Sequence, residues 1–227
     1  QHRFGVHQRL ALQSKGRDGG SNVLAMTATP IPRTLLMTHY GDLDVSRLRD
    51  KPAGRKPVET KAIPAERIEE VVQGLRRAVT GGAQIYWVCP LIESSMVSEL
   101  AAAEERQAHL AQVFGEQVGL LHGAMTPAAK DKMMAEFSDN KIKVLVSTTV
   151  IEVGVNVPNA SIMVIEHAER FGLAQLHQLR GRVGRGSRAS SCILVTGPDG
   201  SADRLRILEE TNDGFLVAES DLENRRS

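Results

Sequence analysis

The side chains best suited to chemistry in this sequence are four arginines in one short stretch. They fall within nine residues that contain no Asp or Glu: Arg180, Arg182, Arg185 and Arg188. A guanidinium group is a planar, permanently charged fork that matches the oxygens of a phosphate. If the segment is helical, Arg182 and Arg185 lie on the same side of it. Charge alone favours a solvated basic helix end, so phosphate binding needs support from the surrounding pattern.

The residues just before these arginines indicate a helix with one apolar side. Leu173, Leu176 and Leu179 recur at roughly helical spacing. One side of this helix can therefore pack against a core while another side carries charge.

The full pattern Gln178-x-x-Gly181-Arg182-x-x-Arg185 resembles the last motif of the superfamily-2 helicases. In that family two arginines reach the γ-phosphate of ATP across a cleft between two lobes. The resemblance implies that Arg182 and Arg185 are catalytic arginine fingers. Such a finger stabilises charge that develops on the transferred phosphoryl group, and it contributes about 10³–10⁵ in rate in nucleotide hydrolases.

A second segment, residues 147–158, resembles helicase motif V. By this resemblance the segment contacts DNA phosphates through Thr148 and Thr149. The same resemblance, together with the last motif, gives the residues expected to bind ATP: Gln178, Glu152, Gly154 and Asn156. The family usually has Asp where this chain has Asn156, which can still hydrogen-bond a ribose hydroxyl but carries no charge.

The first forty residues carry two further resemblances. Residues 27–34 are similar to helicase motif III, and residues 1–6 are similar to the end of the Asp-Glu-Gln-His box. They imply that the nucleotide state is coupled to DNA through His2, Thr27 and Thr29. They also imply DNA contacts from Arg33 and, by the similarity of residues 120–123 to a strand-end segment of the family, from His122. Local patterns alone favour a polar turn with capping threonines and a structural turn histidine.

The cofactor expected from the resemblance is ATP with Mg²⁺. The Asp and Glu that hold Mg²⁺ would precede Gln1, and the sequence contains no Gly-x-x-x-x-Gly-Lys-Ser/Thr phosphate loop. We therefore expect a first lobe outside these residues to hold the nucleotide. We expect no metal site here, because Cys89 and Cys192 are isolated in apolar runs, which is typical of buried free thiols in a reducing compartment.

The elements that must position these residues follow an α/β pattern from Val58 onward. Apolar runs that read as strands alternate with helical segments and cover residues 60–63, 85–89, 118–121, 144–146, 162–165 and 191–195. The helices between them are expected at residues 65–80, 98–114 and 126–137. Strands that are apolar throughout imply a parallel sheet covered by helices on both faces, with ligands at the carboxyl ends of the strands. His122, Thr148, and the pair Glu166 and His167 follow strands in this way.

We divide the chain into four parts. Residues 1–48 are the end of a first RecA-like lobe, with a buried strand at residues 23–26; residues 49–60 are a linker, and residues 61–197 are a second RecA-like lobe. Residues 198–227 read as two short helices broken at residues 212–214. Composition alone makes this tail a surface hairpin, whereas the resemblance implies a partial element that couples ATP hydrolysis to DNA movement.

Composition limits the classes of function. The net charge is +1, so nucleic acid must be bound by local patches, and aromatic residues at 4% leave little for base stacking. No apolar run approaches the ~20 residues that span a bilayer, and no signal peptide opens the sequence. We expect a soluble, cytoplasmic protein.

Residues 3–9, 40–46 and 208–215 make the resemblance more specific, because they are similar to the RecG family of branch-migrating DNA helicases. The resemblance implies an ATP-dependent double-stranded DNA translocase that remodels stalled forks and Holliday junctions in recombination and repair. Its partners would be branched DNA and, in the same polypeptide, the first lobe and an N-terminal wedge domain. The chain alone is expected to lack ATPase activity.

Two alternatives remain open at this point. Transcription-repair coupling factors share the stretch 171–185, and the chain could also be a non-catalytic module that binds nucleic acid or a partner protein. A dinucleotide-binding enzyme is disfavoured, because no Gly-x-Gly-x-x-Gly follows a strand.

Overall fold

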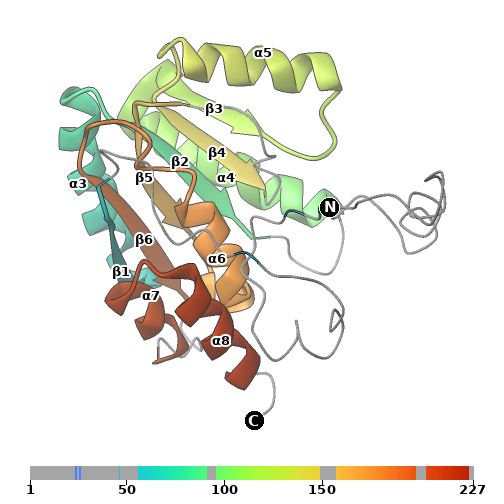
Figure 1. The fold of residues 1–227 in the computed structure, drawn as a ribbon. Helices are drawn as coiled ribbons and strands as arrows, with labels where there is room; N and C mark the ends of the chain where they lie inside the picture. The colour runs from blue at the N-terminus through green and yellow to red at the C-terminus, as the bar shows by residue number, and fades with distance from the viewer. Residues whose placement is uncertain are drawn as a thin grey trace, which may run out of the picture.

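The computed structural model describes residues 24, 26, 46, 56–90, 96–148, 157–197 and 203–224 (Figure 1). These residues form a six-stranded sheet in which every pair of neighbouring strands is parallel. Its strands are β1 (Val58–Pro64), β2 (Gln84–Cys89), β3 (Val118–Leu121), β4 (Val144–Thr148), β5 (Ala160–Ile165) and β6 (Ser190–Thr196). Their order across the sheet is β1-β6-β5-β2-β4-β3.

Helices cover both faces of this sheet, as the sequence predicts. One face is covered by α3 (Ile68–Thr80) and α4 (Met96–Phe114), and the other by α5 (Pro127–Ser138) and α6 (Leu173–Arg180). On the first face, α3 connects β1 to β2 and α4 connects β2 to β3. On the second face, α5 connects β3 to β4 and α6 lies between β5 and β6, as the chain returns across the sheet. This is the arrangement that right-handed crossovers require.

Two apolar cores, one on each face, hold the layers together. Alternate side chains of β2 enter opposite cores: Ile85 and Trp87 pack under α3 and α4, whereas Tyr86 and Val88 pack on the side of α5 and α6. All six residues of β2 are buried, because both faces of this central strand are covered.

The helix ends follow from local chemistry. The Thr126 hydroxyl accepts a hydrogen bond from the Ala129 N–H at 3.3 Å, and Pro127 occupies the first turn of α5. This is the cap predicted from the sequence. At the end of α3, Gly82 has a φ of +85°, which a residue without a Cβ adopts without strain.

The tail forms α7 (Arg206–Glu210) and α8 (Gly214–Asn224), the two helices that the sequence predicts. They lie beside β1 and α6 in Figure 1. Leu205, Leu208 and Val217 are at most 2% exposed and belong to the core on the α6 side. The interpretation from composition alone, a surface hairpin, is therefore wrong, because the tail completes a core.

One predicted strand is contradicted. The run at residues 23–26 was expected to be a buried strand, but Leu24 is 82% exposed and Met26 is 74% exposed, and neither lies in a strand. A run of four apolar residues is buried as a strand only where neighbouring strands pair with it. Within the described residues, the sheet contains only β1 to β6.

Among the described residues, none of the helices has both the length and the apolar character that a membrane span requires.

Candidate functional site

The helix that precedes the arginines is fixed by its apolar side. Leu173, Leu176 and Leu179 are 1%, 0% and 7% exposed, which confirms the side predicted from their spacing. Burial of each of these side chains contributes roughly 1.5–3 kcal/mol. Helix α6 is therefore a rigid support for whatever follows its carboxyl end.

The two predicted fingers do not lie on the helix itself. Helix α6 ends at Arg180. The Gly181 N–H donates to the His177 carbonyl at 3.1 Å, and the Arg182 N–H donates to the Leu179 carbonyl at 2.9 Å. Arg182 and Arg185 lie in the turn that follows, which we call the arginine turn (residues 181–186). The argument that helical spacing places them on one side is therefore wrong, because Gly181 closes the helix first. Gly184 shapes the turn instead, with a φ of +74° that favours glycine.

The arginine turn is packed closely against the rest of the lobe. A Cβ at Gly184 would lie 3.0 Å from a methyl group of Val58, and a Cβ at Gly186 would lie 2.5 Å from the backbone oxygen of Pro158. A side chain at Gly186 would clash with backbone, and one at Gly184 would be both tightly packed and strained by the positive φ. The turn is thus held in place from both β1 and the residues before β5.

The charges of Arg182 and Arg185 are close enough to affect each other. Burial lowers the pKa of Arg182, the charge of Arg185 lowers it further, and Tyr86 opposes both effects. Burial raises the pKa of Tyr86 to about 12, while the charges of Arg185 and Arg182 pull it down. Both guanidinium groups therefore act on Tyr86 of β2, whose side chain packs on the α5 and α6 side of the sheet.

Neither of these arginines has a carboxylate partner within the described part of the chain. Arg185 is exposed, and its Nε donates to the Gly181 carbonyl at a long 3.4 Å. Two neighbouring cations, one of them partly buried, that have no carboxylate partner among the described residues favour an anion with several oxygens. Of the described residues, no group of three or more His, Cys, Asp or Glu could hold a metal ion.

The other two arginines of the stretch have structural partners. Arg180 is 3% exposed, and its Nη1 donates to the carbonyls of Leu208 at 2.7 Å and Thr211 at 3.0 Å. The Nη1 of Arg188 donates to the Gly81 carbonyl at 2.6 Å. Sequence spacing does not distinguish these two from Arg182 and Arg185.

The tail holds α6 at both of its ends. At the amino end, the Leu173 N–H donates to a carboxylate oxygen of Asp221 in α8 at 3.1 Å. At the carboxyl end, Arg180 binds the carbonyls that end α7. The helix that leads into the arginine turn is thus joined to α7 and α8 by directed polar contacts as well as by packing.

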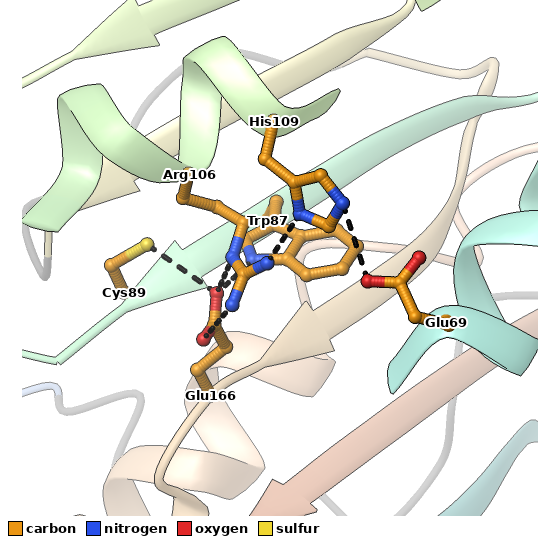
Figure 2. A network of polar contacts seen from close by, with 6 residues as sticks. All are labelled: Glu69, Trp87, Cys89, Arg106, His109 and Glu166. Carbon is orange, nitrogen blue, oxygen red and sulfur yellow. Dashed lines mark hydrogen bonds and ion pairs between the residues drawn. The ribbon is translucent and has the colours of Figure 1, made fainter. Parts of the chain in front are cut away.

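A polar network joins the carboxyl ends of β2 and β5 (Figure 2). Glu166 accepts from Arg106 of α4 through both carboxylate oxygens, at 2.7 Å to Nε and 2.9 Å to Nη2. The indole N–H of Trp87 donates to the same carboxylate, and the Arg106 guanidinium lies 5.4 Å from the Trp87 ring centroid. The network continues from Arg106 to His109 at 2.9 Å, and from His109 to Glu69 at 3.2 Å.

This network was missed from the sequence, except that Glu166 was noted as a strand-end residue. Its partners lie 60 and 79 positions earlier in the chain. One signal was available: the indole N–H of a buried Trp usually finds an acceptor, and Trp87 lies inside a fully apolar strand.

The remaining predicted residues have the following positions. His122 is partly exposed directly after β3, and Thr148 is 4% exposed at the end of β4. Gln178 is partly buried on α6. The other predicted residues lie outside the described residues: His2, Thr27, Thr29, Arg33, Thr149, Glu152, Gly154 and Asn156.

Both cysteines are buried free thiols, as predicted. Burial raises the pKa of Cys192 to about 12, and burial together with the charge of Glu166 raises the pKa of Cys89. Both thiols are therefore protonated and unreactive at neutral pH.

Comparison with known families identifies this lobe. The family described as "Helicase conserved C-terminal domain" matches residues 66–187, which is more than half of the chain. The chain belongs to this family. The matched range of the helicase C-terminal domain contains β2 to β5, α6 and the arginine turn.

Several curated relatives are named "ATP-dependent DNA helicase RecG". The chain is 56% identical to the RecG of Acidithiobacillus ferridurans over 99% of its length, 54% to that of Escherichia coli K12 and 50% to that of Bacillus subtilis. It spans about a third of the length of these relatives (33% or 34%).

Solved structures show the same similarity to RecG. RecG bound to a three-way DNA junction superposes with a TM-score of 0.78 at 45% identity, covering 98% of this chain and 28% of that chain. Dbp5 of S. cerevisiae, at 17% identity, has a TM-score of 0.54 and covers 95% of this chain and 48% of its own. The likeness to Dbp5 shows that the two proteins share this fold.

Proposed function

We propose that this chain forms the arginine-donating lobe of an ATP-driven motor that moves along double-stranded DNA and remodels branched DNA. The observation that carries the proposal is the arginine turn. Arg182 and Arg185 are neighbouring cations that lack a carboxylate partner within the described residues, and a rigid helix supports them. In the closed motor they would meet the γ-phosphate of ATP and stabilise the charge that develops there.

The nucleotide would be held mainly by another lobe of the same protein. The described residues of this chain include no group that suits Mg²⁺. We propose that Mg²⁺ is bound on that other lobe, and that Gln178, Glu152, Gly154 and Asn156 approach ATP from this side. Mg²⁺ would neutralise negative charge on the phosphates while the two guanidinium groups neutralise the remainder.

The substrate assignment rests on the relatives. They are named ATP-dependent DNA helicases, and the RecG structure contains a three-way DNA junction. We propose that this chain contacts the DNA backbone through His122, Thr148, Thr149 and Arg33. Because the Thr148 side chain is almost fully buried here, its contact would involve the backbone N–H or a change in the loop that follows.

The contacts that α7 and α8 make with the two ends of α6 support a coupling role for residues 198–227. A displacement of α7 and α8 would be transmitted to α6 through Arg180 and Asp221, and from there to the arginine turn. We propose that His2, Thr27 and Thr29 perform the corresponding task on the first lobe. The division at residues 48, 60 and 197 and a cytoplasmic location belong to the same proposal.

The test is DNA-stimulated ATP hydrolysis by the protein that contains both lobes. A branched DNA should stimulate phosphate release, and Arg182→Ala or Arg185→Ala should lower kcat by about 10³-fold or more. Arg188→Gln is the matched control, because that arginine binds a carbonyl of the protein, and it should retain activity. The chain of 227 residues alone should not hydrolyse ATP.

Two results would contradict this proposal. One is hydrolysis by the isolated chain that exceeds hydrolysis by its Arg182→Ala variant. The other is DNA binding without any stimulated hydrolysis in the protein with both lobes, which would favour a non-catalytic nucleic-acid-binding module.

A further inference from the structure

The residue after Glu166 has an unusual backbone. His167 has a φ of +47°, in the left-handed region that only a few per cent of residues other than glycine adopt. In the described residues, Asn140 is the one other non-glycine residue with a positive φ. Strained backbone of this kind persists where surrounding contacts fix it, and it is often found at functional sites.

Contacts on both sides fix the strained residue. Before it, the Glu166 N–H donates to the Val88 carbonyl at 2.9 Å, and the Glu166 side chain is tied to Arg106 and Trp87 (Figure 2). After it, the Arg170 N–H donates to the His167 carbonyl at 2.9 Å. The network in Figure 2 thus holds the end of β5 so that His167 keeps this conformation.

The imidazole of His167 is also oriented. Its Nδ1 lies 3.2 Å from Oε1 of Glu169, and the other Glu169 oxygen accepts from the Gly197 N–H at 3.1 Å. A Cβ at Gly197 would lie 3.0 Å from both Glu169 Oε1 and His167 Nδ1, so any larger residue there would press on this pair and shift it. The His167 side chain is nevertheless 41% exposed.

An oriented, exposed imidazole at this place suits a phosphate. With Nδ1–H donated to Glu169, the ring nitrogen left for a ligand is Nε2. In the imidazolium form both ring nitrogens carry protons, so the ring can bridge the carboxylate and an oxygen of a second anion. His167 follows β5 and His122 follows β3, three strand spacings away, or about 14 Å along the same edge of the sheet.

We propose that His167, held by Glu169, binds a phosphate of the DNA backbone at the carboxyl edge of the sheet. This inference rests on the proposed function, because it adds a contact to the same DNA-binding edge. A contact of this kind positions the strand without reading its sequence. A metal ion is a poorer occupant, since the described residues around this pair do not provide three ligands.

The experiment uses the purified protein that contains both lobes. Fluorescence anisotropy measures its binding to a labelled three-way DNA junction at several salt concentrations. His167→Asn is the central variant, because Asn tolerates the left-handed conformation while it removes the imidazole. We expect about tenfold weaker binding and a salt slope reduced by about one. Glu169→Gln and Gly197→Ala leave the imidazole in place but disturb its orientation, and each should weaken binding by a smaller factor.

The control is Lys141→Gln. It removes an exposed cation beside Asp139, just before β4 and so at the opposite edge of the sheet. This variant should bind as the unaltered protein does. The Tm of each variant should stay within a few degrees of the original, so that a change in binding is not a change in folding.

The outcomes separate the two proposals. If the unaltered protein does not bind the junction, the proposed function fails and this inference fails with it. If the unaltered protein binds and His167→Asn binds equally well with the same salt slope, only the inference is overturned. A His167→Asn variant that loses Tm and binding together would make His167 a structural residue, which also overturns it.

Discussion

Two arginines of the same short stretch, Arg180 and Arg182, have different surroundings and therefore different roles. Arg180 is buried among protein carbonyls, whereas Arg182, two positions later, has no carboxylate partner within the described residues. The difference comes from the tail, which lies 28 to 31 positions further along the chain. A local sequence pattern contains no information about that contact.

Arg180→Ala should therefore destabilise the fold. It leaves the carbonyls of Leu208 and Thr211 and the hydroxyl of Thr60 without their donor, and we expect a loss of about 3 kcal/mol or more in the free energy of unfolding. Arg182→Ala should change stability by less than about 0.5 kcal/mol. Urea unfolding of both variants measures the difference, and equal losses would contradict these assignments.

Glu166 offers a second prediction for a single residue. Its side chain is 12% exposed and that of Arg106 is 20% exposed, so Glu166→Ala leaves a largely buried cation unpaired. We expect a loss of about 3 kcal/mol in the free energy of unfolding. The double variant Glu166→Leu with Arg106→Met removes both charges and should recover most of that loss. A double variant as unstable as Glu166→Ala would show that the ion pair is not the cause.

Among the elements, α6 depends on groups outside itself. Its amino end has no side-chain cap of its own, because the residue at that position is Gly172. Asp221 of α8 supplies the missing acceptor. A carboxylate at this end also interacts favourably with the helix dipole.

Asp221→Ala should cost about 1 kcal/mol of stability, as the loss of a helix cap does. Its larger effect should be on hydrolysis in the protein with both lobes, because the support of the arginine turn becomes looser. The measurements are urea unfolding and DNA-stimulated phosphate release for Asp221→Ala and Asp221→Asn. If the Ala variant keeps full stimulated activity, α8 does not position the turn.

The elements also show what sequence can and cannot predict. Strands such as β2 and β6 were placed within one or two residues, because buried parallel strands are continuous apolar runs. The strand expected at residues 23–26 was wrong because the same signal does not reveal whether a neighbouring strand is available. Of the site, only residues that belong to a recognisable motif, such as Arg182 and Arg185, were predicted. The roles of Arg180, Glu166 and His167 depend on contacts between distant segments, which a local pattern does not contain.

At the scale of the whole molecule, both cores contain a buried acid that resists ionisation. Burial raises the pKa of Cys192 and of Tyr86 to about 12 on the α6 side, and the pKa of Cys89 is raised on the α4 side. In the unfolded chain a thiol ionises near pH 9, so above that pH the unfolded state releases protons that the folded state keeps. Stability must then fall as the pH rises from about 9 towards 12.

Each thiol should contribute a loss of about 2 kcal/mol and Tyr86 a smaller one, so we expect the free energy of unfolding to be on the order of 5 kcal/mol lower at pH 10.5 than at pH 8. Urea titrations at a series of pH values measure this. The Cys192→Ala variant should show a shallower decline, since one of the three groups is gone. A flat profile up to pH 11 would mean that these groups ionise as easily in the folded protein as in water.

The pairing of the first strand with the last has a consequence for synthesis. Val58 of β1 lies beside Ser190 of β6, and in the part of the chain that the structure describes β6 is the one strand next to β1. At about 5–20 residues per second, a ribosome needs on the order of 10 s to make the roughly 130 residues between them. We therefore expect the hydrogen-bonding groups of the β1 segment to stay without their β6 partner throughout that interval.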